Sequence, residues 1–506
     1  MDFATFIAPL PVENFRADYF GQRPLHIPAD PAHDGPRRAL LDWERLNHLL
    51  AQRPHRLGAE AERALAALGE VLQAPAMIYN RSKAGDIRFA PFPDGAGTVH
   101  ANSFNGFESR HESAADAGVR RAAWASFSAG LQAHHHTWGA TFATEVGKNV
   151  ALARLRGHPG AEAMLLQPHR VPQALYTQIL DIIQAGLAPH MQRLARLRCR
   201  VLGLDRLLYC DLKAPLDPAF NPPMPWDQAC ALMLEALAPM GPDYLGFVRR
   251  ALTQRWVDRG DNFGKSSGAF CASIYGVHPY ILITWSDTLR NAFTLAHELG
   301  HGGHFNLAMQ HQRFANLRPA MPFIEAPSTL NEMLLAQHLL ARSQEPRLRR
   351  SVILQVLGTY HHNFVTHLLE AELQRQAYAR AESGGAITAA VLDELKGGIL
   401  ARFWGDTVEI DDGARMTWMR QPHYYMGLYP YTYAVGLVAS TAMAQRIQDE
   451  GAPAVQRWTE ALKAGGTQAP LQLMQMAGID MGTPQPIHDA VAHVGRLIDE
   501  LEALFD

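Results

Sequence analysis

Two histidines and a glutamate stand at a spacing that suits metal chemistry. In NAFTLAHELGHGGHF, His297 and His301 are four residues apart within a helical pattern, and Glu298 follows the first histidine. At 3.6 residues per turn the two imidazoles are offset by only about 40°, so both reach one ion from the same helix face. Neutral imidazole is a good zinc ligand, and the glutamate of H-E-x-x-H takes a proton from the activated water. The competing interpretation is a pair of surface histidines beside a glutamate.

A catalytic zinc ion usually takes three protein ligands, so a third donor is expected. Glu325 in FIEAPSTLNEML is the best candidate, because it follows His297 by 28 residues (325 minus 297), after a proline-marked turn and before a helix start. Glu332 comes about two turns later on the same face, where it can orient a ligating imidazole. The alternative for Glu332 is a buried carboxylate that pairs with a nearby cation. The sequence thus predicts one Zn²⁺ ion held by His297, His301 and Glu325.

Composition indicates an ordinary globular protein. The chain has 506 residues, of which 47% are hydrophobic and 19% charged, and its formal net charge is -3. That charge gives no indication of a nucleic-acid or membrane partner, and no stretch of about 18 apolar residues is present. The four cysteines show no C-x-x-C spacing. The N-terminus lacks the basic start and apolar core of a signal peptide, so we expect a cytoplasmic protein.

The length favours two lobes or more. Residues 1–58 are proline-rich and irregular, and we interpret them as an extension of unclear role. Apolar residues then recur every three or four positions, which predicts a helical N-terminal lobe over 59–220. A proline-rich break at 211–226 precedes the predicted catalytic domain, 221–506, where GAFCASIYGVHPYILITW predicts a short strand or hairpin. The predicted fold class is therefore mainly α, with a small β-sheet beside the H-E-x-x-H helix.

Several separated segments resemble the oligoendopeptidase F family, which is related to thimet-type oligopeptidases. Besides the two segments quoted above, they are APAMIYNRSKAGDIRF, GKNVALARLRG, GKSSGAFCASIYGVHPYILITWSDTLRNAFTLAHELGH and PHYYMGLYPYTYAVG. The resemblance covers about residues 60 to 490. It implies a two-lobed helical metallopeptidase of the zincin type with a deep substrate channel, and it implies that Glu298 is the general base and acid. The region before residue 59 is shorter than the family's usual N-terminal portion and unlike it, which leaves the substrate size open.

The resemblance also assigns residues that contact substrate. Members of this family use a histidine and tyrosines from a later segment to hold the substrate carbonyl and the developing oxyanion, and the matching residues are His423, Tyr429, Tyr431 and Tyr433. Donors aimed at charge that appears only in the transition state stabilise it selectively. Alternating tyrosines are also common in packed cores, so we expect at least one of the three to serve only in packing.

A glycine-containing segment resembles the strand with which the family pairs extended substrate backbone. It runs from Ser273 to Tyr280. Backbone pairing distinguishes few side chains, which suits an enzyme that accepts varied peptides. The resemblance therefore places Tyr275, Gly276 and His278 near the cleft.

Other histidines allow plainer explanations. His304 matches the family pattern three residues after His301, and a place around the metal and a structural role both remain open. Consecutive helical residues point about 100° apart, so a solvated face is expected for three adjacent histidines, His134, His135 and His136. The segment GTYHHNFVTHLLEAEL contains His361, His362 and His367. Core or surface placement is favoured for them, although at least one could face the cleft.

The predicted function is hydrolysis of peptide bonds in short or unstructured peptides by a metal-activated water. The alternative is a dedicated peptide-maturation or peptide-binding module that keeps the zinc scaffold without general peptidase activity. Other metal-dependent chemistry on the same scaffold is a third possibility, indicated only by the altered N-terminus. The intact Glu298 favours an active enzyme. The predicted partner is a peptide, and the oligomeric state is left open.

Overall fold

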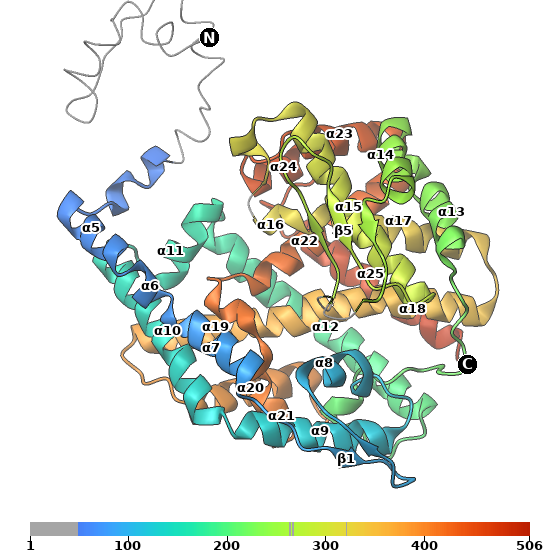
Figure 1. Ribbon diagram of the computed structural model, residues 1–506, viewed down its shortest axis with the longest axis horizontal. Helices are drawn as coiled ribbons and strands as arrows, with labels where there is room; N and C mark the ends of the chain where they lie inside the picture. The colour runs from blue at the N-terminus through green and yellow to red at the C-terminus, as the bar shows by residue number, and fades with distance from the viewer. Residues whose placement is uncertain (1–48, 263–264, 266–267, 320) are drawn as a thin grey trace, which may run out of the picture. The chain divides into compact units, whose positions relative to one another are not determined.

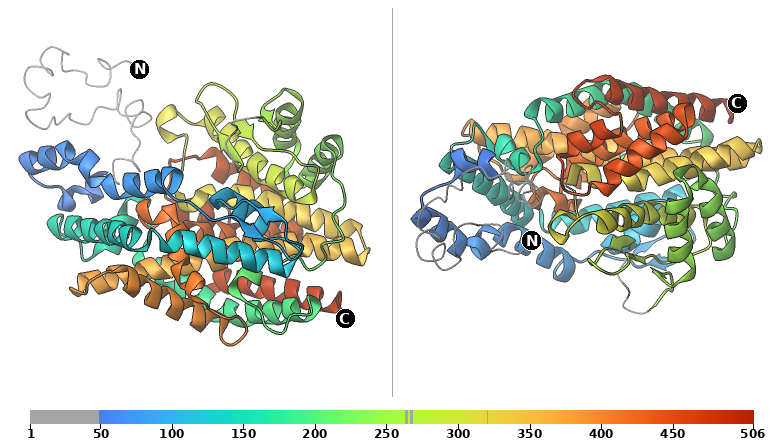
Figure 2. Two further views of the ribbon diagram at one scale, coloured as in Figure 1. Left: turned by 60° about the horizontal axis from the view of Figure 1, so that its bottom comes forward. Right: turned by 90° about the horizontal axis from the view of Figure 1, so that it is seen from above.

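Long helices account for most of the described chain, as the spacing of apolar residues predicts. The computed structural model describes residues 49–262, 265, 268–319 and 321–506. The helices before the H-E-x-x-H motif are α5 (Ala59–Ala67), α6 (Gly69–Leu72), α7 (Ala74–Gly85), α8 (Phe104–Gly106), α9 (Ala117–Gln132), α10 (His135–Leu155), α11 (Ala161–Leu166), α12 (Gln173–Val201), α13 (Trp226–Ala236) and α14 (Pro242–Thr253). Those from the motif onward are α15 (Leu289–His311), α16 (Met321–Ile324), α17 (Ala326–Arg342), α18 (Pro346–Tyr360), α19 (His367–Glu382), α20 (Ala389–Trp404), α21 (Asp412–Arg415), α22 (Pro430–Glu450), α23 (Ala452–Lys463), α24 (Pro470–Met476) and α25 (Gln485–Ala503). Figure 1 and Figure 2 show helices in every view and only short strands, which confirms the mainly α fold class.

The strands form two small sheets. In the first, β1 (Phe92–Pro93) pairs antiparallel with β2 (Val99–His100). The second has the order β3 (Val257–Asp258), β5 (Tyr280–Leu282), β4 (Phe270–Ala272), in which β5 is parallel to β3 and antiparallel to β4. Both β4 and β5 pack against α15, which confirms the small sheet predicted beside that helix.

Helices from both halves of the chain share one core. The residues from Leu57 to Asp506 form one compact unit, in which the 29-residue α12 packs along α25 and also contacts α19, α20 and α22. The shared core gives no boundary near residue 220, so the division predicted there stays a prediction. The apolar residues that α12 buries follow the three- and four-residue spacing of an amphipathic helix, and they include Tyr176, Ile179, Ile183 and Leu187.

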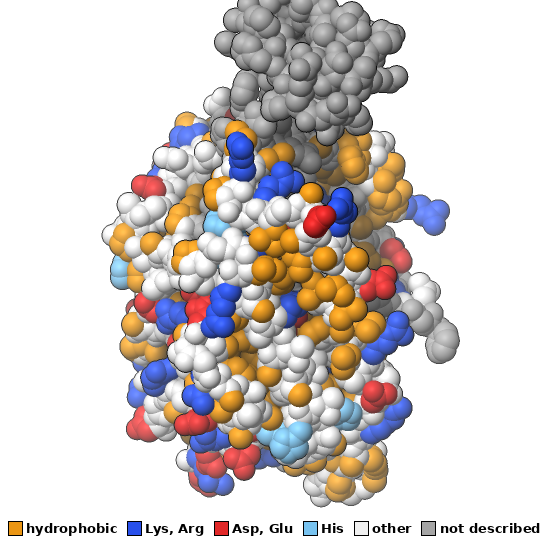
Figure 3. All heavy atoms as spheres, turned by 90° about the vertical axis from the view of Figure 1, so that its left-hand side faces the viewer, with side chains coloured by type: hydrophobic (Ala, Val, Ile, Leu, Met, Phe, Trp, Pro, Cys, Tyr) orange, Lys and Arg blue, Asp and Glu red, His pale blue; other side chains and the backbone are white. Residues whose placement is uncertain are grey.

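The first helices contribute little to this core. No residue of α5 or α6 is buried, and α7 buries only three, which are Pro75, Tyr79 and Ser82. Figure 3 shows hydrophobic side chains gathered on the side where these helices lie, and the exposed apolar residues include Leu68, Val71, Met77 and Ile78. The predicted extension, 1–58, lies mostly outside the described residues.

The cysteines and the hydropathy of the helices bear on the environment of the chain. All four cysteines are free, namely Cys199, Cys210, Cys230 and Cys271. Among the helices of the described ranges, none is both long and apolar enough to cross a bilayer. The cytoplasmic location stays a prediction.

The helix that carries H-E-x-x-H is held closely against its neighbours. Thr288 caps the N-terminus of α15 by accepting a hydrogen bond from a backbone N–H of the first turn at 3.2 Å, and α17 packs against both α15 and α22. Two glycines permit the close approach. A Cβ at Gly300 would lie 2.3 Å from the Pro327 carbonyl oxygen, and one at Gly436 would lie 2.9 Å from Cβ of Glu325. Because both contacts meet the chain at the start of α17, these glycines decide how near Glu325 comes to the histidines.

The substitution Gly300→Ala tests this contact. The added methyl group would meet backbone atoms, which cannot rotate away, so we expect overpacking to lower the free energy of unfolding by about 1–3 kcal/mol. Gly398→Ala in α20 is the control, because a Cβ there meets nothing within 4 Å. In the control, the free energy of unfolding should rise by roughly 0.5–1 kcal/mol, because alanine is favoured over glycine inside a helix. Denaturant unfolding measures both variants, and equal stabilities would contradict the role given to Gly300.

Candidate metal centre

Three potential metal ligands converge between α15 and the start of α17. The rings of His297 and His301 lie one helical turn apart, with their centroids separated by 4.9 Å. Their Nε2 atoms lie 3.5 and 3.4 Å, respectively, from Oε2 of Glu325. One ligand atom from each residue lies within 4.8 Å of the other two. The structure therefore brings the three sequence-predicted ligands together in one cluster.

Glu325 is held in place by contacts at the junction of α16 and α17. Its carbonyl oxygen accepts hydrogen bonds from the hydroxyls of Ser328 and Thr329 at 2.8 and 2.7 Å. Ser328 also donates to Oε2 of the Glu325 carboxylate at 3.1 Å. The hydroxyl of Thr329 lies 2.8 Å from that of Ser440 on α22, which ties the junction to a third helix. The protein itself thus positions the carboxylate toward the two imidazoles.

The cluster attracts positive charge. Burial would raise the pKa of Glu325, but the imidazoles of His301 and His297 hold this pKa well below its ordinary value. Burial would lower the pKa of His297, yet hydrogen bonding to Glu325 and Glu332 raises it well above its ordinary value. Two imidazole nitrogens and a carboxylate oxygen form a common donor set of catalytic metal sites, with a further position open for water. The residues therefore fit a divalent metal ion, which would replace the shared proton.

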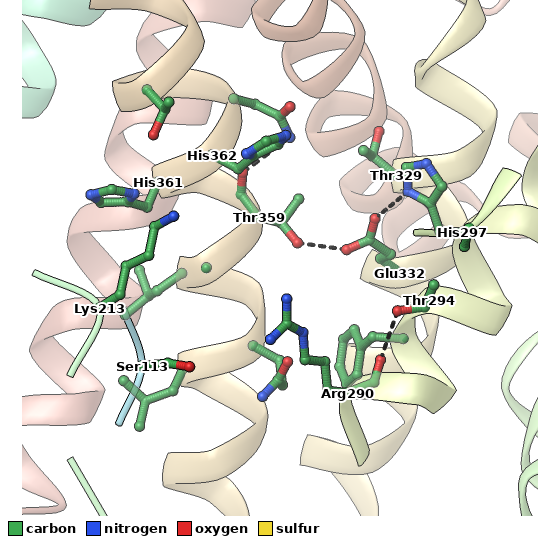
Figure 4. Close-up of a pocket in the computed structure, with 18 of the residues that line it drawn as sticks. Ser113, Lys213, Arg290, Thr294, His297, Thr329, Glu332, Thr359, His361 and His362 are labelled. Carbon is green, nitrogen blue, oxygen red and sulfur yellow. Dashed lines mark hydrogen bonds and ion pairs between the residues drawn. The ribbon is translucent and has the colours of Figure 1, made fainter. Parts of the chain in front are cut away.

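Glu332 contacts the far side of the first histidine. Its Oε1 atom lies 2.6 Å from Nδ1 of His297, and its Oε2 atom accepts a hydrogen bond from the Thr359 hydroxyl at 2.5 Å (Figure 4). With Nδ1 protonated, Nε2 of His297 keeps its lone pair for the metal position. No lysine or arginine of the described chain forms an ion pair with Glu332. The geometry is that of a carboxylate that orients a ligating imidazole.

Glu298 lies on the cavity wall beside the ligands. Its side chain is buried, and its Oε2 atom has no hydrogen-bond partner among the described residues. Burial raises the pKa of Glu298, and the neighbouring His297 and His301 oppose that rise. A carboxylate oxygen with no protein partner is available to a water or a substrate. This is the placement expected for a general base.

The ligands open onto a large cavity with a volume of about 1190 Å³. Its walls include residues of α15, α18 and β4, and part of a π-helical turn, His361–Thr366. Figure 4 shows His297 and Glu332 on one wall, with His361, His362 and Lys213 across from them. π-Helical turns are frequent at functional sites, and this one brings two histidines to the lining. A cavity of this size accommodates an extended peptide segment.

A cluster of rings borders the cavity. The His423 ring lies 4.9 Å from that of Tyr429, 5.6 Å from that of Tyr433 and 5.1 Å from that of His367. Tyr429 and Tyr433 line the cavity, and Tyr433 stacks on His367 at 4.1 Å. Burial raises the pKa of both tyrosines, while burial and the nearby Lys83 lower the pKa of His423 to about 4. The raised pKa values keep both phenols protonated at neutral pH, and the lowered pKa of His423 keeps its ring neutral.

Tyr431 occupies a different face of α22. Its ring is 1% exposed and packs edge to face against Tyr176 of α12 at 5.1 Å. Its hydroxyl has no hydrogen-bond partner among the described residues. Residues four apart share a helix face and residues two apart do not, so Tyr429 and Tyr433 meet the cavity whereas Tyr431 does not. The structure places Tyr431 in the core, as expected for at least one of the three.

The residues predicted near the cleft from the sheet lie in a turn. Tyr275 and Gly276 form part of the connection from β4 to β5, with Gly276 at a φ of +83°, and His278 stacks on an indole ring at 4.3 Å. Of the described residues that line the cavity, none belongs to this connection, whereas Phe270 and Cys271 of β4 do line it. The predicted position of the three residues is therefore corrected to the hairpin turn. The sequence pattern marks a hairpin but does not show which part of it faces the cavity.

Two further histidines are in the core. His304 is fully buried against the rings of Phe305 and Phe323, and burial lowers its pKa to about 3. A neutral ring among aromatic rings favours packing over a place around the metal. The expected solvated face was wrong for His135, which is buried with its Nε2 atom 2.7 Å from Asp393 of α20.

Of the three histidines of which at least one could face the cleft, His361 and His362 line the cavity, although core or surface placement was favoured. The Nε2 atom of His362 lies 3.1 Å from that of His367. The two are five residues apart, which is the hydrogen-bonding interval of a π-helix. Arg290 lies seven residues before His297 and therefore on the same face of α15. Thr359 carries no such signal, because its approach to Glu332 depends on how α18 packs against α17.

Comparisons with known proteins identify the family. The model described as peptidase family M3 matches residues 110–493, and the one described as oligopeptidase F matches residues 43–89. Oligopeptidase PepF of Bacillus subtilis (strain 168) is 30% identical over 463 residues, which cover 91% of this chain and 68% of that protein. An oligoendopeptidase F homolog of Lactococcus lactis subsp. lactis (strain IL1403) is 28% identical over 90% of this chain and 76% of its own. The crystal structure of oligoendopeptidase-F from Enterococcus faecium shares the fold, with a TM-score of 0.76 at 24% identity over 93% of this chain and 79% of that one. The chain therefore belongs to peptidase family M3, with oligoendopeptidase F among its relatives, and is a peptidase.

Proposed function

We propose that the protein is a zinc-dependent endopeptidase or oligopeptidase that hydrolyses short or unstructured peptides with an activated water. The observation that carries the proposal is the cluster of His297, His301 and Glu325, whose ligand atoms lie within 4.8 Å of one another, with Glu298 beside it on the wall of the cavity. The two-histidine, one-glutamate donor set favours zinc. When bound there, zinc polarises the scissile carbonyl and lowers the pKa of the attacking water.

Glu298 is the proposed general base and acid. Its buried Oε2 atom, which no described protein group bonds, is available to take the proton of the attacking water. Burial raises the pKa of this carboxyl group, which strengthens it as a base. The same carboxyl group then gives the proton to the leaving amine, so it returns to its starting state after each cycle.

The developing oxyanion meets uncharged donors from α22 and the segment before it. Tyr429 and Tyr433 line the cavity and carry protonated phenols, and His423 lies within 6 Å of both, measured between ring centroids. Donors fixed by packing stabilise a charge that appears in the transition state without having to reorganise. The stacking of Tyr433 on His367 supplies that fixation.

The substrate backbone is proposed to lie along β4. This strand is at an edge of the described sheet, because β5 lies between it and β3. Phe270 and Cys271 of β4 line the cavity that contains the metal ligands. An extended peptide added to such an edge gains main-chain hydrogen bonds and needs no particular side chains. The binding role predicted for Tyr275, Gly276 and His278 is therefore proposed for β4 instead.

The substitution Glu298→Gln tests the function. It keeps the size of the side chain but removes the base, so we expect peptide hydrolysis to fall by about 10²–10⁴-fold while bound zinc is retained. Hydrolysis of a mixed pool of quenched peptides and elemental analysis measure the two quantities. The wild-type enzyme treated with chelator is the control, and it should lose both activity and metal. A zinc-loaded wild-type protein that cuts nothing would indicate a peptide-binding module instead.

The substitution Glu332→Gln tests how His297 is oriented. The amide is a weaker acceptor for the Nδ1 proton of His297, so we expect metal affinity to fall by about 10–100-fold. Glu394→Gln on the exposed face of α20 removes the same charge away from the site and should leave affinity unchanged. Competition with a zinc indicator measures both variants. Undiminished affinity in Glu332→Gln would assign this carboxylate to packing alone.

A phenylalanine series separates the tyrosines. Removing the hydroxyl of Tyr429 or Tyr433 should lower kcat, by about 10²–10³-fold for the one that bonds the oxyanion, with little change in KM. Tyr431→Phe should leave kcat unchanged, because its hydroxyl lies in the core. Steady-state kinetics on one quenched peptide compare the three variants. A loss confined to Tyr431→Phe would overturn the assignment.

A further inference from the structure

The cavity wall beyond the metal ligands is rich in cations. Five lysine and arginine residues line it, namely Arg198, Lys213, Arg290, Arg318 and Arg347. Apart from Glu298, Glu325 and Glu332 at the metal cluster, the acidic residues of the described chain that line it are Glu108 and Asp217. The formal net charge of the whole chain is -3, so the positive wall is a local feature and does not follow from the composition.

Some of these cations are already neutralised by protein carboxylates. Arg347 pairs with Asp217 at 2.6 Å, and Lys213 pairs with Glu112 at 2.8 Å. Glu112 also pairs with Arg420 at 3.1 Å, and Arg420 pairs in turn with Glu108 at 3.0 Å, so two carboxylates balance these two cations. Three of the lining cations form no ion pair with any described residue, namely Arg198, Arg290 and Arg318.

Among these, Arg290 has the most direct relation to the metal ligands. It lies at the second position of α15 and is exposed to the cavity. It shares a helix face with His297 and His301, seven and eleven residues further on. Figure 4 shows its guanidinium reaching into the open space below Glu332, whereas Lys213 lies along the opposite wall with its ammonium group beside His361. An anion in that space would therefore meet the unpaired guanidinium of Arg290.

The spacing along α15 fixes how far such an anion lies from the reacting bond. Seven helical residues correspond to a rise of about 10 Å. An extended peptide covers that distance in about three residues. A negative group bound by Arg290 therefore belongs to a residue within about three positions of the bond that is cut.

Carboxylate is the anion that peptides themselves carry. A guanidinium bonds it through two parallel N–H donors, which makes the pairing specific in geometry as well as in charge. We propose that Arg290 binds a carboxylate of the bound peptide and so determines which peptides are cut. The proposal rests on the peptidase function proposed above. The carboxylate is either the C-terminus of a short peptide or the side chain of an aspartate or glutamate.

Matched peptides test the proposal and distinguish the two sources. One pair has the same sequence with a C-terminal acid or amide three residues after the cleaved bond, and a second pair carries aspartate or asparagine within three residues of it. We expect the carboxylate form of at least one pair to be cut with about tenfold higher kcat/KM, mainly through KM. The pair that shows the difference identifies the source. Equal kcat/KM within both pairs would overturn the proposal.

Variants of Arg290 connect the preference to this residue. Arg290→Met should abolish the difference in kcat/KM between the two peptides of the responding pair, because KM rises for the carboxylate form alone. Arg290→Glu should reverse the preference. The control is Arg249→Met, which removes one exposed positive charge of α14 outside the cavity lining. It should keep the wild-type ratio. A ratio that survives in Arg290→Met, or an equal loss for both members of the pair, would contradict the role of Arg290.

A binding measurement separates failure of this proposal from failure of the peptidase function. Fluorescence anisotropy of labelled peptides with the zinc-loaded Glu298→Gln protein reports affinity without turnover. Tighter binding of the carboxylate form that depends on Arg290 supports the site even where the wild-type protein cuts nothing. Equal binding of both forms, together with chelator-sensitive cleavage, would leave the peptidase and remove the carboxylate site.

Discussion

The close contact of α15 with the start of α17 is the constraint on which the rest of the site depends. Gly300 follows Glu298 by two residues in the H-E-x-x-H motif, and its missing Cβ lets the backbone of Pro327 and Ser328 approach α15. The ligands then come from two helices at a fixed separation. A Cβ at this position would lie 2.3 Å from the Pro327 carbonyl oxygen, so the start of α17, which follows Glu325, would have to shift. The metal geometry is therefore set by backbone packing.

The part of the site that the sequence predicts lies on α15 and α17. His297 and His301 follow from helical periodicity, and Glu325 and Glu332 follow from one further helix that begins behind a proline. Each inference needs only one element and one packing partner. The mainly α fold and the short hairpin are predictable for the same reason, because apolar spacing is a local property of the sequence. The division near residue 220 is not local, since α12 packs with helices from the other end of the chain.

The remaining site residues are hard to place from sequence, because their positions depend on the rotational phase of a helix and on contacts between distant segments. Tyr431 and Tyr433 differ by two positions, yet one packs on Tyr176 and the other stacks on His367. Family resemblance alone does not distinguish them, whereas the phase of α22 does. The π-helical turn changes the phase between α18 and α19, so His362 meets the cavity although a regular helix would be expected there. Tyr275, Gly276 and His278 were expected near the cleft but lie in the hairpin turn. The sequence predicts the hairpin but does not show which of its strands is at the edge of the sheet.

Charge is distributed unevenly around the cavity, and this distribution links the metal centre to the choice of peptide. The carboxylates of Glu298, Glu325 and Glu332 are gathered at one place, where the proposed divalent cation would bind. Arg290 stands about two helical turns away on the same face, with no acid of the described chain paired to it. In the proposed function, a bound peptide therefore meets an electrophilic centre and a separate positive site on one helix. Because both are fixed to α15, a negative group held at the second sets the distance of the peptide backbone from the first, and so the position of the cut.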